Sequence, residues 1–298
     1  MEERGIEPRL SGGAGGSEAD RTGGRLPNFL VIGTTKGGTT SLHHYLAEHP
    51  DVYLFPGKEV HYFDVNHHES LAWYRAHFAP AGSQRAVGEK TPEYLADPDA
   101  AARMAAVVPT ARLIAILRHP VDRAYSHYWM QRAKFPSPET FEELVEAEIR
   151  DPNAHPPPPH HRYLQIGRYA EHLRRFDDLM PKAPKLILTM DELESAPETT
   201  YVTMCRFLEI DETYVPATLG KVFNPTRALR SARLRRLMLR TRIWKRAPRL
   251  ATRLDRANRT EGYPPLSDDL RAKLLDYYRP HNQALAERLG RDLSAWDR

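Results

Sequence analysis

The sequence predicts an α/β fold, in which a single domain has a central parallel sheet flanked by helices. Three short apolar segments have the composition of buried strands: "NFLVIG" (28–33), "RLIAILR" (112–118) and "KLILTM" (185–190). Each of them is followed by a segment with helical periodicity. Strands that alternate with helices in this way form a parallel sheet with helices on both faces.

The helices are predicted from their start and stop signals. "TSLHHYLAEHP" follows the first strand, "HPVDRAYSHYWMQRAKF" follows the second with Pro120 in its first turn, and "DELESAPETTYVTMCRFLEI" follows the third. The last helix, in "LSDDLRAKLLDYYRPHNQALAERLG", has Ser267 as its N-cap and Gly290 at its end. We therefore expect one domain over residues 26–298. Residues 1–25 are rich in Gly, Arg and Glu and are expected to form a disordered tail.

Length and composition are those of a globular protein, with 298 residues, 41% of them hydrophobic and 28% charged. No apolar run approaches the ~20 residues that a membrane span needs, and no apolar signal region is seen near the start. Cys205 is the only cysteine, which excludes an intrachain disulfide. It lies in a helical apolar pattern and is interpreted as a buried structural thiol. We expect a reducing compartment and a cytoplasmic location.

The formal net charge of +4 is unevenly distributed along the chain. Residues 227–259 contain many arginines and almost no acid, with Leu, Met, Ile and Trp between them. Such a tract predicts an anionic partner, and three readings stay open: peripheral contact with a membrane, binding of an anionic polymer, or a solvated helix over the site. Nucleic acid is not the expected partner. "DPNAHPPPPHHR" (151–162) is predicted to be a surface loop.

The stretch "FLVIGTTKGGTTSLHHYL" (29–46) combines a strand, a glycine-rich turn and a helix start. Backbone N–H groups converge at such a turn, and the helix dipole favours negative charge there, so the stretch predicts an anion site. It is a P-loop-type loop, since it fits the pattern G-x-x-x-x-G-K-[ST] at Gly33, Gly38 and Thr40. The lysine position, however, holds Thr39, and the lysine stands three residues earlier, at Lys36.

The displaced lysine separates two classes of phosphate-binding protein. In a nucleoside triphosphatase the lysine reaches the β- and γ-phosphates, and an acid after another strand holds Mg²⁺. Here "RLIAILR" ends in Arg118, so a Mg–triphosphate is poorly supported, and a P-loop kinase or triphosphatase is the alternative reading. The loop residues expected to bind the anion are Lys36, Gly37, Gly38, Thr39, Thr40 and Ser41.

Several motifs together resemble those of the sulfotransferases that use 3′-phosphoadenosine 5′-phosphosulfate (PAPS). "IGTTKGGTTSL" resembles their 5′-phosphosulfate loop, and "RHPVDRAYSHYWMQ" resembles their 3′-phosphate motif. "KEVHYFD", "EKTPEYL" and the closing "YPPLSDDLRAKLLDYYRPHNQALAERLGRDLSAW" resemble the heparan-sulfate-type branch and its bacterial relatives, so that the resemblance spans nearly all of residues 26–298. It implies transfer of a sulfuryl group from PAPS to a hydroxyl of a glycan, glycolipid or secondary metabolite. It implies no metal, because the donor carries its own activation.

The resemblance also implies roles for residues of the nucleotide site. Lys36 would neutralise the leaving phosphate as the S–O bond breaks. Arg118 and Ser126 would grip the 3′-phosphate, which suits a guanidinium at a strand end and a hydroxyl about two turns into the next helix. Asn224 and Arg230, in "FNPTRALRS", would complete the nucleotide site.

Transfer to a hydroxyl needs a base or a strong hydrogen-bond acceptor that assists late. If "KEVHYFD" is strand-like, Glu59 and His61 point to one face, and Asp64 is close by. The heparan-type branch favours Glu59 as the base, whereas the small-molecule branch favours His61. Lys90 resembles a lysine that contacts the sulfate and the acceptor. The alternative is that Glu59 forms only a structural ion pair, with Lys58 or Lys90.

The sequence departs from the heparan-type branch before its closing helix. That branch usually has a disulfide-bonded loop there, which a chain with one cysteine cannot form. The basic tract 227–259 stands in its place. The acceptor is therefore left open by the sequence.

Overall fold

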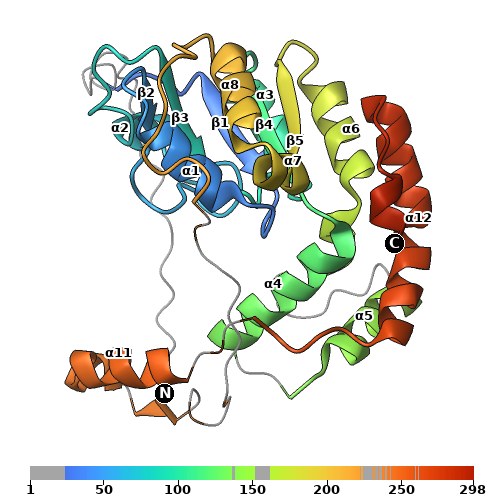
Figure 1. Cartoon of the computed structure of the whole chain (residues 1–298). Coiled ribbons are helices and arrows are strands. Elements are labelled where there is room, and N and C mark those ends of the chain that lie inside the picture. Colours follow the sequence, from blue (N-terminus) through green and yellow to red (C-terminus); the bar gives the residue numbers. More distant parts are fainter. Residues whose placement is uncertain are drawn as a thin grey trace, which may run out of the picture.

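The structure, a computed structural model, describes residues 24–298 except 136–137, 152–161, 222, 224–230, 232–233, 235–236, 239, 242, 259 and 261 (Figure 1). The expected tail and the Pro/His loop lie almost wholly outside the described residues, as do Asn224 and Arg230. The predictions made for them stay predictions.

Five strands form one fully parallel sheet in the order β2-β3-β1-β4-β5. Their bounds are β1 Phe29–Gly33, β2 Val52–Leu54, β3 Ala86–Lys90, β4 Arg112–Leu117 and β5 Lys185–Thr189. The predicted α/β class with a central parallel sheet is confirmed. The sequence had indicated β1, β4 and β5 only, because β2 has three residues and β3 reads "AVGEK", too short or too polar for a buried-strand pattern.

Helices cover both faces of the sheet (Figure 1). Their bounds in the described residues are α1 Thr39–Ala47, α2 Leu71–Ala76, α3 Ala100–Val107, α4 Pro120–Lys134, α5 Phe141–Arg150, α6 Tyr169–Leu179, α7 Met190–Ser195, α8 Pro197–Leu208, α10 Ile243–Arg246, α11 Pro248–Ala257 and α12 Asp268–Leu289, with short 3-10 turns η3 Gln165–Gly167 and η4 Ser294–Asp297. In β1, Leu30 and Ile32 join one apolar cluster while Phe29 and Val31 join the other. This alternation explains why the strand is apolar throughout.

Of two helix predictions, the one for the helix after β5 is wrong and the one for the closing helix is confirmed. The long helix expected after β5 is divided into α7 and α8, because Pro197 starts a new helix and cannot continue the preceding one. The closing helix α12 is as predicted. The Ser267 side chain accepts a hydrogen bond from the N–H of Leu270, and Gly290 ends the helix with a positive φ of 61°.

The strand order places the ends of three strands around one point. The chain passes from β1 through β2 to β3 on one side, and then returns to β4 on the other side of β1. Ligands of open α/β sheets bind at such a switch point, beyond the carboxyl ends of the strands. The loop after β1, Lys90 at the end of β3 and Arg118 after β4 all lie there. Cys205 is buried in α8, as predicted, and burial raises the pKa of its thiol to about 11.

Candidate active site

A cavity of about 1100 Å³ lies at this switch point. It collects most of the side chains that the sequence had singled out from separate motifs. Predicted residues in its wall are Lys36, Gly38, Thr39, Thr40, Ser41, Glu59, Lys90, Arg118 and Ser126. Gly37 and His61 adjoin this wall without lining it.

The loop between β1 and α1 owes its shape to its glycines. A Cβ atom on Gly37 would lie 2.4 Å from the carbonyl oxygen of Ile116 in β4, so no larger residue fits there. Gly38 precedes α1 with a φ of 99°, in the region that favours glycine. Lys36 has a φ of 70°, a backbone conformation that costs a lysine on the order of 1–3 kcal/mol. Strain of this kind is typical of ligand-binding loops.

Helix α1 is held to a later segment of the chain by contacts from its first two turns. The Ser41 hydroxyl accepts a hydrogen bond of 3.2 Å from the N–H of Phe223, and the Tyr45 hydroxyl donates one of 2.9 Å to the carbonyl of Lys221. Phe223 also stacks on the ring of His44, with 3.9 Å between ring centroids. The segment around residue 221 therefore forms one wall of the cavity, beside the helix N-terminus.

Cationic groups gather on the floor of the cavity. Burial lowers the pKa of Lys36, and the nearby charges of Arg118 and Lys134 lower it further. Three cationic side chains therefore line one cavity, and the ammonium of one of them is partly buried. Such a site favours the binding of an anion. Lys134 was missed in the sequence, where it is only the last residue of a predicted helix.

Ser126 provides a second sign of an absent ligand oxygen. The residue is only 1% exposed, yet its Oγ has no hydrogen-bond partner among the described residues. Buried hydroxyl groups are almost always paired. Because Ser126 and Arg118 line the same cavity, this hydroxyl fits an oxygen of an anionic ligand held by the arginine.

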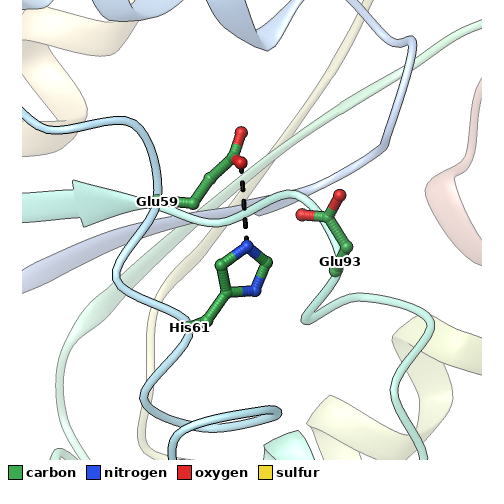
Figure 2. Close-up of side chains that lie close together, drawn as sticks. All are labelled: Glu59, His61 and Glu93. Carbon is green, nitrogen blue, oxygen red and sulfur yellow. Dashed lines mark ion pairs between the residues drawn. The ribbon is translucent and has the colours of Figure 1, made fainter. Parts of the chain in front are cut away.

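Another part of the wall holds Glu59 and Glu93, with His61 beside them, and these three residues are called the acid cluster (Figure 2). Lys90 Nζ donates a hydrogen bond of 3.0 Å to Glu59 Oε1, and His61 Nε2 lies 3.7 Å from Glu59 Oε2. The other ring nitrogen of His61 is 2.9 Å from a carboxylate oxygen of Asp64. The segment is a loop and not strand-like, since His61 has a φ of 56°, but Glu59 and His61 still meet.

These contacts determine the charge states of Glu59 and His61. Burial alone would raise the pKa of Glu59, but His61 and Lys90 together outweigh it and lower the pKa to about 2. The hydrogen bond to Asp64, followed by that to Glu59, raises the pKa of His61 to about 10. His61 is therefore an imidazolium at neutral pH and has no free lone pair to accept a proton.

A buried carboxylate behind this cluster was missed by sequence reasoning. Glu89 is fully buried and accepts hydrogen bonds from the hydroxyls of Tyr74 (2.7 Å), Tyr94 (3.1 Å) and Thr91 (2.8 Å). Burial raises its pKa to about 7. Thr91 Oγ1 also accepts the N–H of His61, so Glu89 supports the loop that bears the acid cluster. Its signal in the sequence is its place as the first residue of "EKTPEYL", beside Lys90, but that motif assigned it no role.

Two further wall residues were not predicted. Burial, and then the charge of Lys90, lower the pKa of His43 to about 4, so this imidazole is neutral at pH 7. Burial and the charge of Glu59 raise the pKa of Glu93, whose Oε2 has no hydrogen-bond partner in the described part of the chain. Glu59, His61 and Glu93 place ligand atoms within 4.8 Å of one another (Figure 2). A metal ion there would have to displace the His61 proton, which the high pKa of this histidine opposes.

Comparisons with known proteins agree with this geometry. The family model described as "Sulfotransferase domain" matches residues 26–248. Heparan sulfate glucosamine 3-O-sulfotransferase 3B1 of Mus musculus is 30% identical over 275 residues, which cover 92% of this chain and 65% of that relative. The crystal structure of a sulfotransferase from Alicyclobacillus acidocaldarius superposes with a TM-score of 0.70 and 26% identity, over 92% of this chain and 100% of that one.

The expectation of a cytoplasmic location is wrong. The chain is also similar to the membrane-associated sulfotransferase kil1 of Dictyostelium discoideum, with 41% identity over 132 residues. The matched region covers 41% of this chain and 28% of that protein. This membrane-associated relative overturns an inference that rested on a single cysteine and the absence of an apolar run. Among the described residues, no helix has the length and apolar character to cross a membrane.

Proposed function

This chain belongs to the sulfotransferase-domain family, and from that premise we propose that it transfers the sulfuryl group of PAPS to a hydroxyl of a glycan. The observation that carries the proposal is the cavity at the switch point, whose floor gathers cations and whose far wall holds an ion-paired carboxylate. An anionic donor suits the first surface, and a hydroxyl acceptor suits the second. Because the chain spans 65% of the length of the mouse relative, the activity itself is part of the proposal.

The donor occupies the floor of the cavity in this proposal. The loop from Lys36 to Ser41 surrounds the 5′-phosphosulfate with backbone N–H groups and hydroxyls at the start of α1. Arg118 and the unpartnered hydroxyl of Ser126 hold the 3′-phosphate. The strongest support is that burial and the charges of Arg118 and Lys134 lower the pKa of Lys36, an unfavourable arrangement of charge that a bound anion would relieve. Asn224 and Arg230 remain predicted members of the nucleotide site.

Lys36 is assigned to the leaving group. Its ammonium is partly buried, and the charge on the bridging oxygen grows as the S–O bond breaks, so their attraction is largest in the transition state. A donor that carries a good leaving group needs no metal to activate it, and we expect turnover in the presence of a chelator.

Glu59 and Lys90 are assigned to the acceptor. Glu59 lines the cavity, whereas His61 stands behind it as an imidazolium that orients the carboxylate. With a pKa of about 2, Glu59 serves best as a hydrogen-bond acceptor that takes the hydroxyl proton late, when the attacking oxygen has become acidic. In this proposal Lys90, which donates to Glu59, moves toward the incoming sulfuryl oxygens and leaves Glu59 more basic at that moment.

A transfer assay tests the proposal. The protein would be incubated with ³⁵S-labelled PAPS and, separately, with heparosan, chondroitin and a glycolipid, and the products would be analysed by mass spectrometry. Labelled glycan that is formed by the natural protein, and not by Lys36→Ala, is the expected result. Incorporation into none of the acceptors, with hydrolysis of a nucleoside triphosphate instead, would favour the kinase or triphosphatase reading.

Membrane contact through residues 227–259 is a separate proposal. It is supported by the arginines of this tract and by the membrane-associated relative. Flotation with vesicles that contain phosphatidylserine tests it, and vesicles of phosphatidylcholine alone are the control.

A further inference from the structure

The described part of the basic tract presents arginines on one side of a helix. In α11, Arg249, Arg253 and Arg256 are spaced i, i+4 and i+7, which places them on one face. Arg246, at the end of α10, stands three residues before Arg249. All four side chains are exposed, and none has an ion-pair partner within the described ranges. These four residues are called the arginine row below.

The opposite face of α11 is already occupied by the protein itself. Ala251 and Asp255 are buried, and the Asn258 side chain exchanges two hydrogen bonds of 2.9 Å with the backbone of Ser231. An amphipathic helix that inserts into a bilayer needs its apolar face free. The buried positions of α11 hold a small and an acidic residue, and of its two leucines Leu250 is 51% exposed while Leu254 is half-buried, so the helix offers a bilayer only a narrow apolar surface beside its outward charged face. The arrangement therefore favours a polyanion bound at the surface over insertion into a membrane.

The row lies close in the chain to the candidate active site. Tyr263 lines the cavity and follows the end of α11 by six residues, which span at most about 20 Å even when fully extended. Its position is fixed by stacking on Trp129, with 6.0 Å between ring centroids and 5° between planes. The next residue, Pro264, accepts a hydrogen bond of 2.8 Å from the Tyr125 hydroxyl. One elongated ligand can therefore reach both the row and the cavity.

The spacing of the charges also points to a linear partner. Like charges at i and i+4 repel each other by about 0.2–0.5 kcal/mol per pair, and no acid in the described part of α10 or α11 relieves this on the exposed face. A chain of anionic groups running along the helix would relieve it at several points at once. A single small anion would neutralise only one of them.

We propose that the arginine row binds an anionic stretch of the acceptor, a polysaccharide that carries carboxylate or sulfate groups, while another part of the same chain occupies the cavity. The inference rests on the proposed function for the link between the two surfaces. The inference gives the basic tract a role in selecting the acceptor. This tract stands at the place in the chain where the heparan-type branch usually has a disulfide-bonded loop. It predicts that long anionic acceptors are preferred over short ones.

Binding measured without the donor tests the inference separately from the reaction. Size-defined heparin would be titrated into the natural protein and into the triple variant Arg249→Ala, Arg253→Ala, Arg256→Ala. The matched control is Arg85→Ala, Arg174→Ala, Lys182→Ala, which removes the same charge from exposed positions elsewhere. Circular dichroism and the affinity for adenosine 3′,5′-bisphosphate verify that each variant is folded.

The expected result is a dissociation constant about tenfold or more higher for the row variant only, with a shallower dependence of affinity on salt, because fewer counterions are released. Equal weakening in the control variant would show a general charge effect and overturn the inference. So would unchanged heparin binding in the row variant. Loss of binding to phosphatidylserine vesicles without loss of heparin binding would assign the row to a membrane instead. Failure of the proposed function would appear separately, as absent binding of the bisphosphate.

Discussion

Glu59 is held between two cations, and this determines the part it can play. Lys90 donates to one carboxylate oxygen and His61 faces the other. A carboxylate with a pKa of about 2 is a weak base toward a resting hydroxyl, but it accepts a strong hydrogen bond from a hydroxyl whose proton is being lost. The alternative of a purely structural ion pair predicts a different response to mutation.

Replacing Glu59 by glutamine should reduce transfer by about 10²–10⁴, the usual range for removal of a general base. Glutamine keeps the size of the side chain but cannot take up the proton. Donor affinity should stay within about twofold, because the donor site lies on other elements. The matched variant is His61→Asn, which should reduce transfer less. An inactive His61→Asn beside an active Glu59→Gln would assign the base to the histidine.

Stability should depend on pH through the same pair. The pKa of Glu59 falls from 4.5 to about 2 on folding, so its contribution is complete above pH 4.5 and is lost as pH falls toward 2. The pKa of His61 rises from 6.5 to about 10, so its contribution is complete below pH 6.5 and is lost as pH rises through 10. Urea unfolding should therefore show the largest difference between the natural protein and Glu59→Gln at pH 4.5–6.5. A difference that does not vary with pH would contradict this assignment.

Lys36 should matter more for turnover than for binding of the product nucleotide. Lys36→Ala should lower kcat by about 10²–10³, the effect of removing one donor from a site of developing negative charge. Its partly buried ammonium, near Arg118 and Lys134, is the reason for this expectation. Steady-state kinetics and calorimetry would be compared for the same variant. A change in KM alone would remove Lys36 from the role of stabilising the leaving group.

At the scale of elements, β3 supports the loop that bears Glu59. Glu89 on β3 accepts three hydroxyl hydrogen bonds, and a backbone hydrogen bond from Val60 also acts on its carboxylate. Val60 lies between Glu59 and His61. The acid cluster is therefore positioned by a buried carboxylate that does not line the cavity, through hydrogen bonds that no local sequence pattern reveals.

Glu89→Gln should weaken transfer through position and not through chemistry. The amide group offers hydrogens where the carboxylate accepted them, so the loop shifts, and a displacement of about 1 Å can cost about 10² in rate. The melting temperature should fall as well, because buried polar groups lose partners. Tyr74→Phe removes one hydrogen bond only and should have a smaller effect on both. If Glu89→Gln keeps full kcat while it loses stability, the carboxylate serves folding alone.

Some elements were predictable because their signals are local. The strand β1, the glycine turn and α1 follow one another within 29–46, and the Ser267 cap lies beside the helix that it starts. β2 and β3 were not predicted because their pairing with β1 is what makes them strands. The division between α7 and α8 has a local signal as well, because a proline such as Pro197 cannot continue a preceding helix.

At the scale of the whole molecule, the site is made by the topology of the sheet. Lys36, Glu59 and Arg118 follow three different strands, and Lys90 ends a fourth. They meet because β1 lies between β3 and β4. Only the resemblance to a family predicts from the sequence that these four residues belong to one site. Glu89 and Glu93 lie in the motif "EKTPEYL" and Lys134 lies near the end of a predicted helix, but their parts in the site appear only when the chain is folded.

The central claim is that one cavity binds a nucleotide with phosphates at both its 3′ and 5′ positions. Calorimetry with adenosine 3′,5′-bisphosphate and with ADP, each in the presence of EDTA, tests it most directly. The cavity has two separate anion-binding sites, formed by Lys36 with its loop and by Arg118 with Ser126. We therefore expect the bisphosphate to bind without metal and much more tightly than ADP. The variant Ser126→Ala should reduce the difference in affinity between the two nucleotides. Equal affinity for the two nucleotides, or binding that requires Mg²⁺, would contradict the account.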